Sequence, residues 1–579
     1  MASVPAVRSR LDRVADGLRS TPPWLLAIGL AALAFFAVNA LHYGQMPLRI
    51  EESEWPPMAE AIFETGKPVI AAEDTHRVRF TEDLRIDSTP LIGAWHPPLY
   101  QYAMAASMVV VGKDASRALR AVGVLGLLAS ALLLLLIARE VTARWRLIGG
   151  IAAALLLVHP YAIQGSVFLD IDNSVYAPLS LLVLWLAIRF SRRPGPLAPA
   201  EMLALGAALA LVTWAKMTTS VALVVVLVAW WLLSRRPVGR AAGEAAAFVA
   251  TGAALFFSTY GLWCWIADIP FSYTFDVTFV QKSNRLFSDW LLVENAAHWH
   301  LRWFGAALLV LAVVYLGDLL RSLVATRRLR ELDLLFLFGL AVLGNYVLAS
   351  PTDGTYQGKY AVPALAALLL PVVWMLLRVH RQPGTPLGWL GAAAVGAVTA
   401  LLLPDVVTNL SLDGDYGTWR FELLVIAASA GALGLAWWIG GHQGFAGGVL
   451  LVLALLLVAQ GVRSYRSDHS PLYPVPDTVD FRAAVTELNE ATAPGEIVIA
   501  PKDLGFYLDG PVVEGEDAFA RGDDRTAAAI RRYPKIVAVA HDSFGPPIGP
   551  RTAALVDRCF LDRRTIGSVS IAYRSRDCD

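Results

Sequence analysis

The chain has 579 residues, of which 56% are hydrophobic and only 17% are charged, and its mean hydropathy is +0.53. Soluble globular proteins carry about 25% charged residues, so this composition excludes an ordinary soluble domain and predicts a membrane protein. The 48 Lys and Arg residues balance the 48 Asp and Glu residues, and nothing in the sequence indicates a nucleic-acid partner.

Residues 1–22 form a basic arm with no small-residue cleavage signature of the kind that ends a signal peptide. Apolar segments recur from residue 23 to residue 464, and a membrane-spanning helix needs about 20 such residues. By this measure we predict an all-α polytopic bundle of about thirteen spans. The count has a margin of one or two, because two short spans favour a tight hairpin. The spans are 23–41, 119–138, 147–165, 174–190, the short pair 201–215 and 217–233, 244–266, 303–320, 332–350, 360–378, 386–403, 421–440 and 445–462.

Basic residues in short loops stay on the cytoplasmic side of a membrane. With thirteen spans, six basic segments fall on one side, which predicts a cytoplasmic N-terminus and an extracytoplasmic C-terminus. Residues 98–112 are apolar but about five residues too short to span, and a crossing there would move every later basic loop outside. We interpret them as an interfacial or re-entrant helix at the outer face. The basic segments are RSRLDR near the N-terminus, 138–146, 189–195, 234–240, 321–331 and 378–384.

The first outer loop, residues 42–118, begins with an acidic cluster directly after the first span. Glu51, Glu52 and Glu54 fall at the depth of the bilayer interface. Carboxylates are costly to desolvate there and tend to mark a functional site. The alternative is a solvated acidic loop beside a membrane helix.

Two further carboxylates, Asp170 and Asp172, lie in a very short outer loop between the third and fourth spans. Two carboxylates at this spacing can both reach a divalent cation, or one can orient a substrate hydroxyl. The alternative is that Asp172 or Asn173 caps the fourth helix, which leaves Asp170 unexplained.

Basic side chains are predicted at the same outer face. Lys216 lies at the turn between the two short spans, Lys359 and Tyr360 begin a later span, and the aromatic outer loop 267–302 holds Arg285. A lysine in a low-dielectric pocket can neutralise an anionic leaving group. The alternative for each lysine is an ammonium that reaches the lipid headgroups. Together with the carboxylates, these groups favour an enzyme whose substrate has an anionic, lipid-borne leaving group.

Residues 465–579 lose the apolar pattern and predict a small extracytoplasmic α/β domain. An amphipathic helix over Thr478–Ala491 precedes a buried strand over 496–500. Further predicted elements are a helix over 526–533 and strands over 535–541 and 569–575. Cys559 and Cys578 either form a disulfide, as an extracellular location would allow, or remain two thiols.

The motifs and their order resemble the GT-C membrane glycosyltransferases, in the branch of the protein O-mannosyltransferases and lipid A aminoarabinose transferases. RIEESEWPPMAEAIFETGKPV followed by WHPPLYQYAMAAS is similar to the first outer loop of that branch. FLDIDNSVYAPLSLLVLWL is similar to its second acidic loop, LVTWAKMTTS to its Leu-Thr-Lys hairpin and GKYAVPALAALLLP to its Lys-x-x-Tyr-x-x-Pro helix. The resemblance covers about residues 20–380. Glu51 stands where the family usually has Asp, and His96 stands where the aminoarabinose transferases usually have Lys, which argues against that substrate.

The resemblance implies transfer of a hexose or pentose from a polyprenyl-phosphate donor to an envelope acceptor, which is a protein, a lipid or a polysaccharide. It implies Glu51 or Glu52 as the base, Asp170 and Asp172 as ligands of acceptor, sugar or metal, and Lys359 as the ligand of the donor phosphate. Whether a divalent cation (Mg²⁺ or Mn²⁺) takes part is left open, with Glu52, Asp170 and Asp172 as its candidate ligands. The other substrate- or phosphate-binding candidates are Tyr360, Lys216, His96, Tyr100 and Arg285.

Two functions of other classes compete with this one. A lipid or small-molecule transporter also fits thirteen spans, but transporters usually show internal repeats and charges near the bilayer midplane. This sequence has no internal repeat, and its candidate charges gather at the outer edge. The second competitor is a non-catalytic subunit of an envelope assembly, with the C-terminal domain as a docking module.

Overall fold

The computed structural model describes residues 21–44, 55–70, 90–94, 96–112, 115–167, 171–234, 237–280, 306–349, 362–379, 478–505, 507–514, 522–540, 549–567 and 569–575. The chain divides into two compact units. The helical unit comprises residues 1–43 and 122–467, and the mixed unit comprises residues 44–121 and 468–579.

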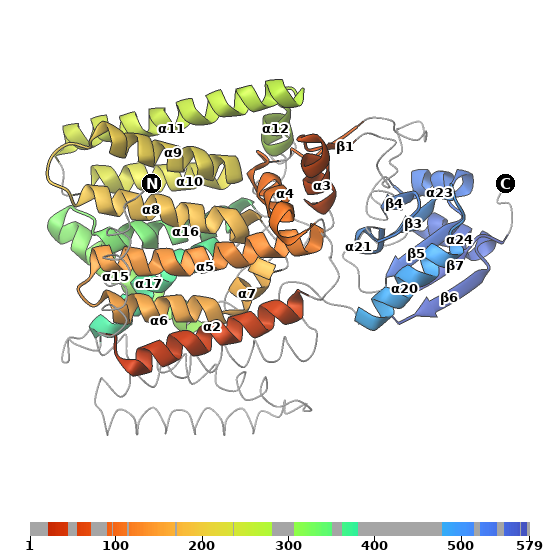
Figure 1. Ribbon diagram of the computed structural model, residues 1–579, viewed down its shortest axis with the longest axis horizontal. Helices are drawn as coiled ribbons and strands as arrows, with labels where there is room; N and C mark the ends of the chain where they lie inside the picture. Colours follow the sequence, from red (N-terminus) through yellow and green to blue (C-terminus); the bar gives the residue numbers. More distant parts are fainter. Residues whose placement is uncertain are drawn as a thin grey trace. The chain divides into compact units, whose positions relative to one another are not determined.

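The helical unit is a bundle in which α11, α9, α8 and α2 run nearly parallel (Figure 1). Three predicted spans, 386–403, 421–440 and 445–462, lie outside the described residues, so the count of thirteen stays a prediction; each of the other ten falls on described helices. Four of these helices are long and apolar enough to cross a membrane: Pro23–His42, Arg117–Val141, Asp172–Ser191 and Val238–Ala267. The elements are α2 (Pro23–Tyr43), α5 (Ala115–Val141, which enters the unit at Val122), α6 (Trp145–Val158), α7 (Pro160–Val167), the π-helix η2 (Asp172–Tyr176), α8 (Ala177–Ser191), α9 (Pro199–Ala215), α10 (Met217–Leu232), α11 (Val238–Ala267), α12 (Tyr273–Phe275), the π-helix η3 (Asp276–Val280), α15 (Ala306–Thr326), α16 (Glu331–Ala349) and α17 (Val362–Val379).

Helices α9 and α10 form the predicted hairpin. The backbone amide of Leu197, which precedes α9, donates to Glu244 at 3.0 Å, and the indole of Trp231, near the end of α10, donates to the same carboxylate at 3.1 Å. The entry to α9 and the exit from α10 therefore lie at the same end of the bundle. Lys216 occupies the turn at the opposite end of this hairpin.

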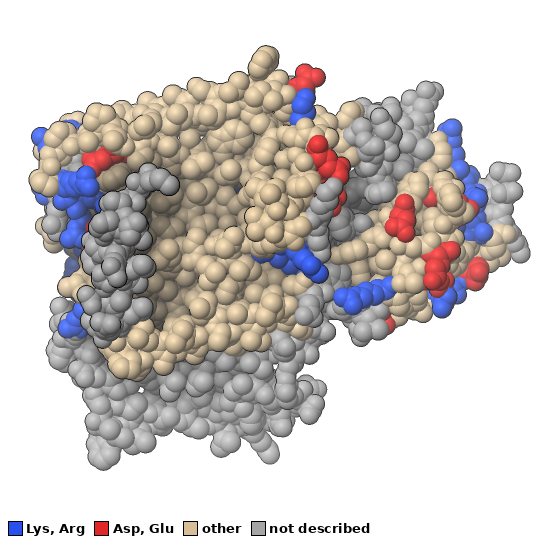
Figure 2. Space-filling view, viewed as in Figure 1, with Lys and Arg blue, Asp and Glu red and all other residues tan. Residues whose placement is uncertain are grey.

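Several of the basic loops meet at one end of the helical unit, which we call the basic end. The amide of Leu329 donates to the carbonyl of Leu233 at 2.9 Å and joins the loops on either side. Arg330 and Arg378 both donate to Asp318, at 2.6 and 2.7 Å. Figure 2 shows Lys and Arg gathered at one end of the helical unit and a broad band beyond them with few charged side chains. This is the arrangement that basic loops sharing one side of a membrane require.

The described residues of the first outer loop, which form the first part of the mixed unit, contain two helices and a two-stranded ribbon. α4 has only 13 residues, as the short apolar segment 98–112 predicts. Val109 and Val110 at its end are 75% and 85% exposed, which suits a helix that lies against lipid. Its place at the outer face stays a prediction. The elements are α3 (Trp55–Thr65), β1 (Val69–Ile70) paired antiparallel with β2 (Leu91–Ile92), and α4 (Leu99–Val111).

The C-terminal part of the mixed unit is a five-stranded sheet of order β4-β3-β5-β7-β6 between two helical layers. β3 is parallel to β4 and β5, whereas β7 is antiparallel to β5 and β6. Alternate strand residues face opposite cores: Val498 packs with α20, and Ile499 packs with α23 and α24. The five predicted elements are confirmed, and α21, β4, α24 and β6 were missed. The elements are α20 (Thr478–Ala491), β3 (Val498–Ala500), α21 (Lys502–Gly505), β4 (Val512–Glu514), α23 (Asp523–Arg532), β5 (Ile536–Ala540), α24 (Pro550–Cys559), β6 (Asp562–Ile566) and β7 (Val569–Tyr573).

Candidate functional site

Three helix irregularities lie in one region of the helical unit. Pro160 follows the end of α6, because proline lacks the amide hydrogen that would continue the helix. The π-helix η2 opens the fourth span, and π-helices occur often at functional sites. Lys216 is extended, with φ −158° and ψ 104°, and separates α9 from α10. Since η2 packs against α7, α9 and α17, these breaks surround one polar region.

An ion pair lies inside this region. The Lys216 ammonium Nζ is 2.5 Å from Oδ2 of Asp172, and the two side chains are 7% and 0% exposed. Lys216 is therefore buried and does not extend to the headgroups, so the structure does not support that alternative for the lysine. Both charges are removed from water, so each stabilises the other where an isolated charge would be costly.

Other buried polar groups surround the pair. The hydroxyl of Tyr176 donates to the carbonyl of Thr219 at 2.9 Å, which joins the end of η2 to the first turn of α10. Asn173 is buried, and its amide has no hydrogen-bond partner among the described residues. A buried amide of this kind is open to water or to a bound ligand. We call residues 171–176, which hold Asp172 and Asn173, the acidic turn.

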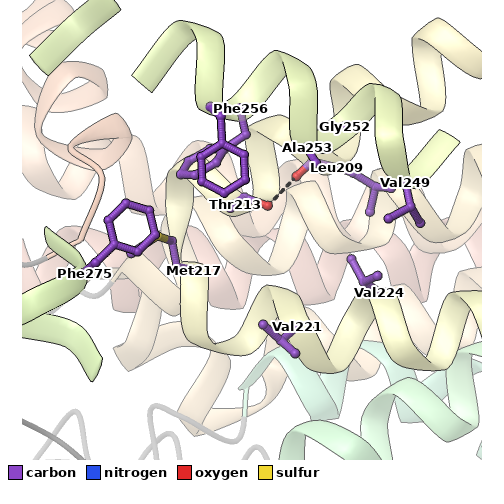
Figure 3. Close-up of a pocket in the computed structure, with 11 residues that line it drawn as sticks. Leu209, Thr213, Met217, Val221, Val224, Val249, Gly252, Ala253, Phe256 and Phe275 are labelled. Atoms are coloured by element: carbon purple, nitrogen blue, oxygen red, sulfur yellow. Dashed lines mark hydrogen bonds between the residues drawn. The ribbon is translucent and has the colours of Figure 1, made fainter. Parts of the chain in front are cut away.

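An apolar groove begins beside the hairpin turn. Met217, which directly follows Lys216, lines this cavity of about 220 Å³ together with residues of α9, α10, α11 and α12. In Figure 3, Val221, Val224, Phe256 and Phe275 surround the same space as Met217. The Thr213 hydroxyl donates to the Leu209 carbonyl of its own helix at 2.9 Å, so it contributes no unsatisfied polar group to the groove.

The groove opens on the surface of the bundle. Val221 is 57% exposed and Phe257 is 49% exposed, and both line it. Beside it, the rings of Trp214, Phe256, Tyr260 and Phe275 pack edge to face or stacked, with neighbouring centroids 5.5–6.1 Å apart. These aromatic contacts hold the end of α11 and α12 in place and give the groove a rigid wall.

Two predicted binding residues, His96 and Tyr100, belong to the mixed unit and are buried there. The Tyr100 ring lies edge-on to Trp55, with centroids 5.4 Å apart. Its neighbour Gln101 donates to the Gly93 carbonyl at 3.0 Å, and Tyr102 donates to the Gly66 carbonyl at 2.8 Å. The WHPPLYQYA segment therefore holds the first outer loop together, whatever else it contacts.

The other predicted site residues lie outside the described part of the chain: Glu51, Glu52, Asp170, Lys359, Tyr360 and Arg285. Their roles stay predictions. Lys359 and Tyr360 come shortly before α17, which packs against η2, and Arg285 follows η3.

Within the described residues, no group of three or more His, Cys, Asp or Glu side chains is placed to hold a metal ion. Of the three candidate ligands, only Asp172 is described. The ammonium of Lys216 pairs with Oδ2 of this carboxylate, so that oxygen is already engaged in the described conformation. No catalytic step is assigned to a metal.

Two features were missed at the sequence level. The pairing of Asp172 with Lys216 joins residues 44 positions apart, and the only signal was two opposite charges next to breaks in apolar spans. The apolar groove gave no signal, because the residue types that line it are common throughout the apolar helices.

No family model and no curated protein matches the chain. Among solved structures, ArnT of Cupriavidus metallidurans bound to undecaprenyl phosphate matches with a TM-score of 0.57 and 15% identity, over 95% of this chain and 97% of ArnT. The apo oligosaccharyltransferase of Archaeoglobus fulgidus matches at 0.47 and 12%, over 88% and 69%. Mycobacterial arabinofuranosyltransferase AftD matches at 0.44 and 13%, over 96% and 42%. The likeness to ArnT shows that the chain has a GT-C fold, as the order of its motifs predicts.

Proposed function

We propose that this chain is a membrane glycosyltransferase that moves one sugar from a polyprenyl-phosphate donor to an acceptor of the cell envelope, at the outer face of the plasma membrane. Its GT-C fold and the undecaprenyl phosphate bound to ArnT support this proposal. The observation that carries it is the apolar groove that begins next to the buried polar region at the hairpin turn. A polyprenyl-phosphate sugar has the same division, with a long apolar chain joined to a polar, anionic head.

The groove suits a length of isoprenoid chain. Its volume of about 220 Å³ lies below the ~300–1,000 Å³ typical of a site that encloses a whole small ligand. A chain held there would have its first part in the groove and the rest in the bilayer, through the opening at Val221 and Phe257. Its binding would come from burial of apolar surface, about 25 cal/mol per Å².

The chemistry requires three contributions from the protein. The acceptor oxygen attacks the anomeric carbon, the bond from that carbon to the phosphate oxygen breaks, and polyprenyl phosphate leaves. We assign the base that takes the acceptor proton to Glu51 or Glu52. We assign the stabilisation of the leaving phosphate to the positive charges of Lys359 and Arg285 and to the hydroxyl of Tyr360. Asp170 is the carboxylate available to orient the acceptor. Asp172 and Lys216 neutralise each other and receive neither role.

The basic end and a disulfide support the proposed orientation. With the basic loops cytoplasmic, the N-terminus lies inside and residues 465–579 lie outside. Cys559 is buried and disulfide-bonded, and disulfides persist in oxidising compartments. Cys264 is free and Cys578 lies outside the described residues. Of the two alternatives for Cys559, the disulfide therefore favours the paired one. It also supports an extracytoplasmic location for the C-terminal domain.

The central experiment uses the purified full-length protein and a panel of radiolabelled polyprenyl-phosphate sugars, with and without EDTA. Release or transfer of the sugar would establish the activity and identify the donor, and the EDTA arm would decide metal dependence. Binding of donors without turnover across the panel would instead favour a transporter or a non-catalytic subunit.

A second experiment tests the groove itself. Ala253 lines the groove, and Ala254 is exposed next to it but does not line it. We expect Ala253→Trp to weaken binding of undecaprenyl phosphate at least tenfold, because the indole fills the groove, and Ala254→Trp to leave binding within about twofold. Equal binding by the wild type and both variants would place the lipid chain elsewhere.

A further inference from the structure

The acidic turn contacts two different parts of the bundle, the α9–α10 hairpin and helix α5. On one side, Asp172 contacts Lys216 and Tyr176 donates to the Thr219 carbonyl, so two bonds connect it to the hairpin turn and the first turn of α10. Both bonds are buried. A buried ion pair fixes geometry more surely than it adds stability, because its attraction is offset by desolvation.

On the other side, two glycines of α5 let the backbone around the acidic turn approach closely. A Cβ at Gly123 would lie 1.6 Å from the carbonyl oxygen of Ser166, and a Cβ at Gly126 would lie 2.1 Å from the carbonyl oxygen of Ser174. Both neighbours are backbone atoms, which cannot move aside as a side chain can. Ser174 belongs to the acidic turn, and Ser166 belongs to the last turn of the helix before it. We call Gly123 and Gly126 the glycine notch.

Resting on the proposed function, we propose that Asp172 and Lys216 are a positioning pair. Together with the glycine notch, they hold the acidic turn in a fixed place relative to the hairpin turn where the apolar groove begins. The pair sets the distance between the acidic turn and the apolar groove. Neither Asp172 nor Lys216 acts as a base or as a phosphate ligand. Each charge of the pair is needed only to neutralise the other, because both are buried.

This role predicts that removing both charges is tolerated better than removing one. Asp172→Asn alone leaves a buried ammonium, and Lys216→Gln alone leaves a buried carboxylate. The double variant Asp172→Asn with Lys216→Gln leaves no charge and keeps amides that can bond to each other. A direct phosphate ligand would behave differently, because Lys216→Gln would lose the same affinity whether Asp172 was charged or not.

The test measures amide hydrogen exchange of peptides covering residues 160–180, and binding of undecaprenyl phosphate, in the full-length protein. We expect each single variant to exchange at least tenfold faster in these peptides and to bind at least tenfold more weakly. We expect the double variant to recover to within about threefold of the wild type on both readouts. A double variant that binds as weakly as Lys216→Gln, or single variants with unchanged exchange, would overturn the proposal.

Gly126→Ala provides a test without any charge change, in case a single variant fails to fold. It brings no functional group near a ligand, yet it should also accelerate exchange in residues 160–180 and weaken binding. Gly29→Ala on α2 is the matched control, because a Cβ there meets nothing within 4 Å. Equal exchange in the two glycine variants would count against the positioning role. Absence of binding by the wild type would overturn the proposed function alone, since the exchange measurements would still decide the positioning role.

Discussion

The two ends of the helical unit solve the same problem, buried charge in an apolar bundle, in opposite ways. At the basic end, Asp318 accepts from Arg321, Arg330 and Arg378 at 3.0, 2.6 and 2.7 Å, and these arginine side chains remain 27–65% exposed. At the other end, where Lys216 occupies the turn between α9 and α10 (the turn end), Asp172 and Lys216 are buried from solvent. The first cluster has several arginine partners with access to water, whereas the second is a buried pair of one carboxylate and one ammonium.

Aromatic side chains at the basic end add a further difference between the two ends. The Arg330 guanidinium lies over the rings of Tyr315 and Trp374, 5.5 Å from each centroid, and the Tyr315 hydroxyl donates to Asp333 at 2.7 Å. Such stacking and multiple hydrogen bonds are typical of a structural cluster. The turn end combines its pair with a π-helix, a proline break and an amide without a described partner. Proteins usually depart from regular packing in this way where they function.

The largest expected effect tests whether the outer carboxylates of the first loop do the chemistry. We expect the double variant Glu51→Gln and Glu52→Gln to lose sugar transfer by about 10²–10⁴-fold, the range for removal of a general base. The radiolabelled transfer assay measures this. Because the change is isosteric, the variant should keep the wild-type melting temperature, and full activity would refute the assignment of the base.

At the turn end, Lys216→Met should destabilise the protein strongly. It leaves the Asp172 carboxylate buried without its ammonium, which costs about 3–5 kcal/mol for a buried pair. Thermal unfolding in detergent measures the loss, and adding Asp172→Asn should restore much of it. A melting temperature unchanged by Lys216→Met would mean that water reaches the pair.

At the basic end, Asp333→Asn should cost less and leave activity intact. Asp333 accepts from Tyr315, from the Arg330 amide and from the Arg330 guanidinium, so the asparagine retains some of these bonds. We expect a loss of about 1.5–3 kcal/mol, the range for a hydrogen bond to a charged group, and sugar transfer within about twofold of the wild type. A large loss of transfer would show that the basic end is coupled to the chemistry.

The smallest effect concerns the C-terminal sheet, whose ion pairs are exposed. The hydrogen bond from Lys535, with one from the Ala493 amide, lowers the pKa of Glu496. Burial raises the pKa of Asp523, but hydrogen bonds from the amides of Arg551 and Thr552 outweigh it and lower that pKa. A carboxyl whose pKa is lower in the folded state stabilises the fold above its unfolded pKa, about 4, and loses this contribution as the pH falls through the folded value.

Residues 465–579 should therefore become less stable as the pH falls below about 4, and Glu496→Gln should reduce the slope of that loss. Circular dichroism of the full-length protein, with the helical signal as an internal reference, measures it. Stability that rises on acidification in this range would contradict the sign of both pKa shifts.

The amino-acid sequence alone predicts the membrane class, the helices at ten of the spans, the α9–α10 hairpin and the core elements of the C-terminal domain. These follow from local composition and periodicity: apolar runs of span length, basic loops, and the amphipathic pattern of Thr478–Ala491. β6 was missed because its residues, DRRTI, are mostly exposed at the sheet edge and lack an apolar pattern.

The sequence does not predict which charged side chains contact each other. Asp172 and Lys216 each looked like a group facing a substrate, and their packing against each other could not be read from positions 44 residues apart. The groove and the glycine notch likewise depend on the approach of helices distant in sequence. Local sequence determines whether a segment is helical and apolar, whereas contacts between segments determine whether a buried charge binds a ligand or another side chain.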